Sequence, residues 1–240
     1  MMPLPLSIQD IGRTVYEFID KFLIQQNRWR MITDGLWNTL ILAFFSAIMG
    51  IILGTVVAIV RNIGSGDAPW ILRLLKKLCD GYVTVVRGTP VMVQLLIWST
   101  VILLWKETLP IAIIGFGFNS GAYVAEIVRA GIDAVDIGQT EAGRSLGLSR
   151  FATMRRIVLP QAVKNVLPAL GNEFIILLKE TSIAVYVGVS DLTQAGAFIK
   201  TVTYDGKVYF VVAGIYLLLV MGLSRILRIF ERRLKKSDRG

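Results

Sequence analysis

The chain has 240 residues, of which 54% are hydrophobic and only 18% charged, and its mean hydropathy is +0.62. This composition is typical of a polytopic membrane protein, so we interpret the net charge of +9 as membrane topology rather than as a nucleic-acid-binding surface. The sequence lacks histidine, holds only Cys79 as a cysteine and has no phosphate-loop motif. We therefore expect no catalytic residue, no metal and no cofactor in this chain.

Residues 1–30 are predicted to form an amphipathic, peripheral segment. One apolar stripe runs through residues 11–24 and consists of Val15, Phe18, Ile19, Phe22 and Leu23. This stripe predicts a helix that lies along the membrane surface, and packing against the first span is an equally good interpretation. Charges spread through the segment argue against a cleaved signal peptide.

Five membrane spans are predicted from the apolar segments. They cover about residues 36–60, 88–105, 109–129, 162–184 and 208–224. Between them we expect a polar connection over residues 61–80, a polar loop over residues 131–160 and a mixed stretch over residues 185–207. Glu173, Lys179 and Glu180 interrupt the fourth span, so that span requires protein neighbours. Small residues at four-residue spacing predict close helix packing in the first and third spans.

Loop charges predict the orientation. Residues 61–77, 129–164 and 225–239 hold four, six and seven Lys and Arg residues, whereas the alternate connections hold one and two. Because positively charged loops stay in the cytosol, five spans place the N-terminus outside and the C-terminus inside. The polar loop and the basic tail, residues 231–240, then lie in the cytosol.

The polar loop carries the sequence Glu141-Ala142-Gly143-Arg144-Ser145-Leu146-Gly147, followed by Ile157-Val158-Leu159-Pro160. We expect a short helix here, which Gly147 ends in a left-handed conformation and after which Ser149 caps the next helix. Glu141 lies near the helix N-terminus, where the helix dipole favours a carboxylate. The pattern indicates a docking point for a soluble partner, with an ordinary amphipathic connector as the alternative.

The motifs together resemble those of the permease subunits of polar amino acid ABC importers, which have the type I import fold and an EAA loop. The matching segments are residues 87–90 with Gln94-Leu95, then residues 120–132, 138–142, 157–160 and 178–183. They extend over about residues 35–225. The chain departs from the family pattern at Gly143, where alanine is usual, and glycine costs about 1 kcal/mol in a helix interior.

The resemblance implies an all-α membrane protein in which residues 31–230 form a single permease domain with a cytoplasmic coupling helix. It implies two ABC ATPase subunits that bind the ATP, a second permease subunit, identical or related, and an extracytoplasmic amino acid-binding protein, all at a bacterial cytoplasmic membrane. Ala142 and Gly143 would let the loop approach the ATPase closely, and Glu141 would pair with a basic group there. The implied coupling residues are Gln139, Glu141, Ala142, Gly143, Ser145, Leu146, Gly147, Ile157, Leu159 and Pro160.

A path for a polar amino acid needs both anionic and cationic or donor groups inside the membrane. Gln94, Asn119 and Glu173 lie at similar depths when each helix residue rises 1.5 Å. The candidate path residues are Gln94, Asn119, Tyr123, Glu173, Lys179 and Thr181. Glu173 with Lys179 or Arg87 would supply both charges, or these residues pair with one another and hold the bundle together.

Two other classes of function stay open at this point. One is a secondary transporter that an ion gradient drives through Glu126 and Glu173, and that would need no ATPase. The other is a membrane anchor that recruits a cytosolic protein without transport. The sequence does not distinguish one amino acid from another as the substrate.

Overall fold

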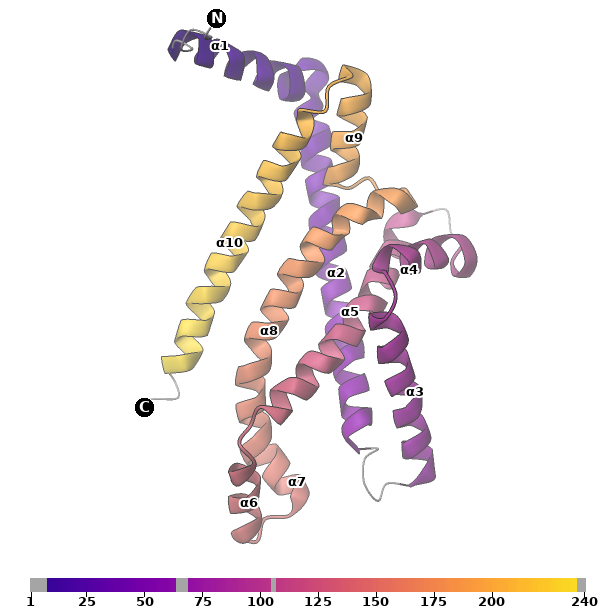
Figure 1. Ribbon diagram of the computed structural model, residues 1–240, viewed down its shortest axis with the longest axis vertical. Helices are drawn as coiled ribbons and strands as arrows, with labels where there is room; N and C mark the ends of the chain where they lie inside the picture. Colours follow the sequence, from indigo (N-terminus) through magenta and orange to yellow (C-terminus); the bar gives the residue numbers. More distant parts are fainter. Residues whose placement is uncertain (1–7, 64–68, 105–106, 237–240) are drawn as a thin grey trace, which may run out of the picture.

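The computed structural model describes residues 8–63, 69–104 and 107–236, and over these ranges the chain is all-α without a strand, as predicted. Long helices run roughly along one axis (Figure 1). The N-terminal helix and α9 (Leu192–Thr203) lie at one end, and the short helices α6 (Ile137–Ser145) and α7 (Arg150–Thr153) lie at the other. The two ends are therefore built differently, and the polar loop occupies one of them alone.

The N-terminal helix α1 (Ile8–Ile19) meets α2 (Arg28–Ile63) at a sharp elbow. Gln26 and Asn27 have φ values of 54° and 55°, which end the helical path between the two helices. The buried Arg28 guanidinium closes the elbow by donating to the Lys21 carbonyl and to the Gln26 side chain. The elbow thus fixes α1 across the end of α2.

The apolar stripe of residues 11–24 packs in part against the first span, as one of its two interpretations predicted. Phe22 is buried in a cluster with Ile32, Leu192 and Ile199, which ties the elbow to α2 and α9. Val15 and Ile19, nearer the start of α1, stay exposed. A membrane-surface position for this exposed part remains a prediction.

Helices α2 and α5 (Thr108–Asp133) form the centre of the fold and approach each other closely. A Cβ atom at Gly54 would lie 2.5 Å from the Gly121 carbonyl oxygen, and one at Gly50 would lie 2.9 Å from the Ser120 side chain. Only glycine permits this separation, so the packing predicted from the small residues of both helices is confirmed. The α2–α5 interface holds the buried face on which the site is built.

Two predictions about the next segment are wrong. Most of residues 61–80 is not a connection, because α3 begins at Trp70 and runs to Arg87. The span predicted over residues 88–105 is not a separate straight helix, because α3 bends by 109° into α4 (Val91–Ile97) and a π-helical turn, Trp98–Ile102. The charges that suggested a loop are paired instead, since Asp80 bonds both Arg61 and Lys76 at 2.7 Å.

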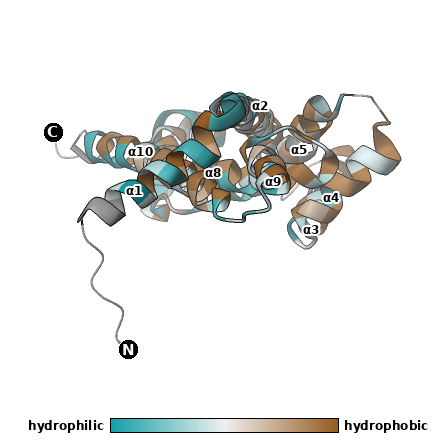
Figure 2. Cartoon of the chain, turned by 90° about the horizontal axis from the view of Figure 1, so that it is seen from above, coloured by the Kyte–Doolittle hydropathy of each residue, from teal (hydrophilic) through white to brown (hydrophobic). Residues whose placement is uncertain are grey.

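The C-terminal half is built from α8 (Leu159–Glu180), a 3-10 turn (Thr181–Val187), α9 and α10 (Val208–Lys236). The stretch predicted as mixed, residues 185–207, therefore contains a helix. Helix α10 packs on α8 and α9, and exposes Phe210, Leu217 and Leu218. Figure 2 shows hydrophobic residues along α10 and α4 at the outside of the bundle, as expected for a lipid-facing surface.

Within the described residues, three helices are long and apolar enough to cross a membrane, and the bent α3–α4 pair makes a fourth if it counts as one span. They include the long helical segment that ends at Ile63, α5, and α10. Helix α8 is not among them, in keeping with the charges that interrupt it. The count of five spans stays a prediction.

Candidate functional site

The polar loop is a rigid pair of short helices. Asp136 caps α6 through a 2.7 Å bond from the Gly138 amide, and Ser149 caps α7 through a 3.2 Å bond from the Ala152 amide. Gly147 has φ of 80° after the end of α6, and the Leu148 amide donates back to the Gly143 carbonyl at 3.2 Å. The short helix, its left-handed end and the second cap are confirmed. Such local bonds fix the loop before any partner arrives.

Gly143 is turned toward its own chain, and its contact with an ATPase stays a prediction. It is buried, and a Cβ atom there would lie 2.8 Å from Thr153 Cγ2 and 2.9 Å from Ile157 Cδ1. The residue is small because α6 packs on the turn that leads into α8. Residues 137, 141 and 145 recur at four-residue intervals and lie about opposite to Gly143 on the helix. Glu141 therefore stands on the outward face.

The other predicted coupling residues lie mostly at the surface. The exposed ones are Gln139, Glu141, Ala142, Ser145, Leu146, Gly147, Leu159 and Pro160, whereas Ile157 is half-buried. The Gln161 amide donates to Gln139 Oε1 at 3.3 Å and ties α6 to α8. A movement of the loop is thereby linked to the helix that carries Glu173.

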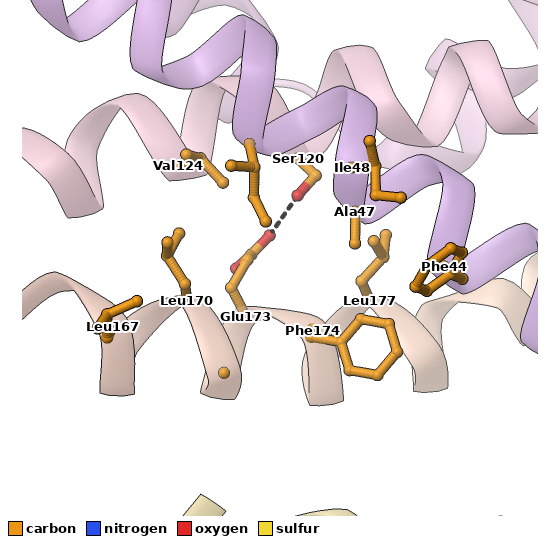
Figure 3. A pocket seen from close by; sticks show the side chains of 12 residues that line it. Phe44, Ala47, Ile48, Ser120, Val124, Leu167, Leu170, Glu173, Phe174 and Leu177 are labelled. Carbon is orange, nitrogen blue, oxygen red and sulfur yellow. Dashed lines mark hydrogen bonds between the residues drawn. The ribbon is translucent and has the colours of Figure 1, made fainter. Parts of the chain in front are cut away.

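Glu173 lies in a pocket of about 390 Å³ between α2, α5 and α8 (Figure 3). Among the described residues that line it, Glu173 is the only ionisable one, and the walls are mainly apolar, with Phe44, Leu170 and Phe174 among them. The Ser120 hydroxyl donates to Glu173 Oε1 at 3.0 Å. In the described part of the chain, Glu173 forms no ion pair. Its carboxylate therefore keeps acceptor capacity for a cation that enters the pocket.

Gln94 and Asn119 lie together, as their similar depth predicts, but not beside Glu173. The Asn119 amide donates to Gln94 Oε1 at 3.0 Å. The Gln94 amide in turn donates to the Val86 carbonyl at 2.7 Å and to the Thr89 hydroxyl at 2.7 Å. It thus satisfies a carbonyl left without a helical partner at the α3–α4 break.

Ser120 follows Asn119 in α5, so the two side chains point about 100° apart on the helix. Gln94 lines a second pocket of about 390 Å³ on the α3–α4 side, together with Trp98 and Phe118. Counting residues along each helix therefore placed Gln94, Asn119 and Glu173 at one depth in the membrane. In the structure, Gln94 and Asn119 lie against one face of α5, and Glu173 lies against another.

The remaining predicted path residues lie outside both pockets. Tyr123 is exposed with the Arg87 guanidinium 5.4 Å from its ring centre, and Lys179 is exposed on α8. Thr181 is fully buried, and its hydroxyl donates to the Leu178 carbonyl at 2.7 Å. The geometry gives Thr181 a structural role at the end of α8.

Charged residues cluster around Glu126, in keeping with a role in holding the bundle together. Glu126 forms ion pairs with Arg61, with Arg129 at 2.9 Å and with Arg87 at 3.5 Å. Arg87 and Arg61 come from α3 and α2, so the cluster holds these two helices and α5 together. Arg129 lies three residues from Glu126 in the same helix, whereas Arg61 and Arg87 are distant in sequence, so local spacing does not reveal them as partners.

The part of the chain that the structure describes holds no group of three His, Cys, Asp or Glu side chains placed for a metal ion. What the site does offer is one rigid exposed loop, one apolar pocket with an acid, and a helix, α8, that connects them. This arrangement suits binding and movement.

Comparison with known proteins agrees with this arrangement. The family model described as binding-protein-dependent transport system inner membrane component matches residues 50–236. The putative glutamine transport system permease protein GlnP of Rickettsia bellii is 36% identical over 225 residues, which cover 92% of this chain and 99% of that protein. The L-cystine transport system permease protein TcyB of Bacillus subtilis is 35% identical over 219 residues, which cover 89% and 91%.

Solved structures are similar over nearly the whole chain. The crystal structure of an amino acid ABC transporter with histidines superposes with a TM-score of 0.79 at 35% identity, and covers 96% of this chain and 100% of that one. An inward facing conformation of the MetNI methionine ABC transporter has a TM-score of 0.75 at 21% identity, with 88% and 99% covered, and shares the fold.

Proposed function

Since the chain belongs to the family of binding-protein-dependent transport system inner membrane components, we propose that it is the permease subunit of an ATP-driven importer for polar amino acids. Its relatives are membrane permeases of amino acid transport systems, and they are not ATPases. The observation that carries the proposal is the rigid loop of α6 and α7, which is exposed at one end of a membrane protein and tied to α8.

The loop is the proposed contact with the ATPases. Two ATPase subunits bind the ATP in the cytosol, and each permease inserts one α6 helix into a groove on an ATPase. Glu141 stands on the outward face of α6, where a basic group of the partner can reach it. Because Gln139 bonds Gln161 at the start of α8, closure of the ATPases moves the helix that lines the Glu173 pocket.

The Glu173 pocket is the proposed substrate contact. A free amino acid carries an ammonium group, and the Glu173 carboxylate accepts only one bond, from Ser120, in the described structure. The relatives carry glutamine, L-cystine and arginine by their names, so the feature that they share is the zwitterionic α-amino acid. Gln94 and Asn119 hold the α3–α4 break and shape the opposite side of α5.

The proposed setting is a bacterial cytoplasmic membrane, with the N-terminus outside and the polar loop and C-terminus in the cytosol. The basic residues of the loop and of α10 support this orientation. A second permease subunit, identical or related, completes the path, and an extracytoplasmic binding protein delivers the amino acid. The permease then alternates between outward-open and inward-open states, and each ligand, ATP or the amino acid, must favour one of the two states.

A gradient-driven transporter was the main alternative, with Glu126 and Glu173 as the ion carriers. Glu126 is paired with three arginines, so its carboxylate is committed to holding α2, α3 and α5 together. This pairing favours the ATP-driven function. A membrane anchor without transport would not require a pocket that contains an acid.

Uptake into vesicles tests the proposal. The chain and the proteins that co-purify with it are reconstituted into liposomes, together with the binding protein and radiolabelled amino acids. We expect uptake that requires ATP on the loop side and survives collapse of ion gradients. Uptake that an ion gradient drives without ATP would show that the protein is a gradient-driven transporter. Absence of uptake by an assembled complex would instead favour the membrane anchor without transport.

A further inference from the structure

Helix α3 lies at the edge of the bundle, beside α2 and α5, and turns an apolar strip outward (Figure 1). The strip consists of Leu74, Leu78 and Val85, which are 50%, 63% and 64% exposed. Since successive residues are about 100° apart on a helix, these three side chains lie within about 40° of one another and extend over about 16 Å. Gly81 leaves an open notch beside them, because a Cβ atom there would meet no heavy atom within 4 Å. The length and the width of the strip suit an acyl chain.

Two cations follow the strip along one edge. Arg73 and Lys77 are exposed, and each directly precedes one of the leucines of the strip. Residues four apart are neighbours on a helix surface, with Cβ atoms about 6 Å apart, so both side chains reach a single phosphate group. Trp70 is exposed and lies seven residues before Lys77 on the same face, in the manner of a tryptophan at a membrane interface. Donors for an anion and a surface for an acyl chain therefore lie side by side.

Arg73 and Lys77 differ from their cationic neighbours because they have no carboxylate partner in the described part of the chain. Lys76 in the same helix pairs with Asp80, and so does Arg61 from α2. Both oxygens of Asp80 are used, since Arg61 donates to Oδ1 and Lys76 donates to Oδ2, each at 2.7 Å. The charges of Arg73 and Lys77 thus stay available for a ligand from outside the chain.

We propose that Arg73 and Lys77 bind the phosphate of an anionic phospholipid whose acyl chain lies along the strip. The connection before α3 is one of the basic segments that the proposed orientation places in the cytosol, so this lipid belongs to the inner leaflet. Two unpaired cations favour a headgroup with net negative charge over phosphatidylcholine, whose own ammonium they repel. The bound lipid holds the first half of α3 at the membrane interface. This inference goes beyond the transport function and does not depend on the substrate.

The test measures which lipid touches the strip. A bimane fluorophore is attached to Val85→Cys in a cysteine-free background of the full-length chain, which is reconstituted with its co-purifying proteins into vesicles. Quenching by phosphatidylglycerol with brominated acyl chains is compared with quenching by brominated phosphatidylcholine. Each basic residue near an anionic lipid contributes about 1 kcal/mol, or about fivefold in affinity. We therefore expect the wild-type side chains to give a preference for phosphatidylglycerol of about 25-fold.

The variants follow from the two cations. Arg73→Gln and Lys77→Gln should each reduce the preference about fivefold, and the double variant should not distinguish the two lipids. Lys77→Arg, which keeps the charge, should stay within about twofold of the wild-type preference. Lys200→Gln removes an exposed cation of α9 and should change nothing. Quenching by brominated phosphatidylcholine needs only contact with lipid, so an unchanged value in every variant shows that the protein is folded and inserted.

Four results would overturn the proposal. A full preference in the double variant would remove Arg73 and Lys77 from the contact. Equal quenching by both lipids in the wild-type background would show an ordinary lipid-facing surface. Absence of quenching by either lipid would show that protein, a partner subunit or a second copy of this chain, covers the strip. Loss of the preference in inorganic phosphate, but not in chloride of the same ionic strength, would show a site for a free anion.

Discussion

Replacing Glu173 by glutamine tests the substrate pocket most directly. The substitution keeps the size and the shape of the side chain and removes its charge. The glutamine amide oxygen can still accept the bond that Ser120 donates at 3.0 Å. Since Glu173 forms no ion pair within the described residues, no cation loses a partner. We therefore expect the free energy of unfolding to change by less than about 1 kcal/mol.

Transport should respond much more strongly than stability. A hydrogen bond between the carboxylate and a substrate ammonium contributes about 1.5–3 kcal/mol, because it is made to a charged group. Since 1.4 kcal/mol corresponds to tenfold, uptake efficiency should fall by about 10- to 100-fold. Assembly with the ATPase and its basal ATP hydrolysis should persist, because Glu173 lies away from the polar loop.

Thermal unfolding and uptake are measured on the same preparation. Ser120→Ala is the matched control, since it removes the hydrogen bond and leaves the charge, and it should cost about 1 kcal/mol with little loss of uptake. A Glu173→Gln protein that is stable and fully active would remove Glu173 from the path. A loss of about 3–5 kcal/mol with failed assembly would instead identify a broken buried ion pair, contrary to the geometry.

Four further predictions follow from the fold. Cysteine introduced at Asp136 in a cysteine-free background should react only with membrane-permeant reagents and cysteine at Asp205 also with impermeant ones; the reverse labelling would invert the topology. Glu141→Arg should leave the protein folded but abolish substrate-stimulated ATP hydrolysis, and normal stimulation in reconstituted vesicles would contradict the coupling role. Gly143→Val should destabilise the loop by about 1–3 kcal/mol, because the larger side chain would overpack against Thr153 and Ile157. Proteolysis within the loop should then be faster, and an unchanged cleavage rate would contradict the close contact at Gly143. The Lys21 ammonium lowers the pKa of Asp205. The stability that this ion pair contributes should therefore be complete above the ordinary carboxyl pKa of about 4 and be lost as the pH falls through the lowered pKa of Asp205. Thermal unfolding should show this loss in wild type and not in Asp205→Asn.

The features that depend only on neighbouring residues were predicted correctly from the sequence. The end of α6 at Gly147 and the cap at Ser149 depend on neighbouring backbone groups only, so the motif was sufficient to place them. The close approach of α2 and α5 was likewise visible in rows of small residues. The family resemblance then predicted the all-α membrane architecture, which the fold and the solved relatives confirm.

What depends on distant partners could not be predicted in the same way. Charges in α3 suggested a connection, because hydropathy counts Lys76 and Asp80 as exposed charges, whereas Asp80 pairs with Lys76 in the same helix and with Arg61 from α2. The direction in which Gly143 faces was likewise not predictable, since the distant Thr153 and Ile157 decide the orientation of α6.

The candidate path failed for a related reason. Residue counting fixes how deep a side chain lies in the membrane, but not the side of the helix from which it projects. Asn119 and Ser120 are adjacent in α5 but point about 100° apart, so Asn119 bonds Gln94 whereas Ser120 bonds Glu173. Ser120 begins the matching segment of residues 120–132, but nothing in that pattern indicates a contact with Glu173.

The α2–α5 interface also constrains how the protein is made. Helix α2 leaves the ribosome with a glycine-lined groove that no earlier segment can fill, because its complement lies in α5. At about 5–20 residues per second, the end of α5 follows the end of α2 only several seconds later. During that interval α3 and α4 must enter the membrane beside an unfilled groove. The groove on α2 is therefore complete only once α5 has been made.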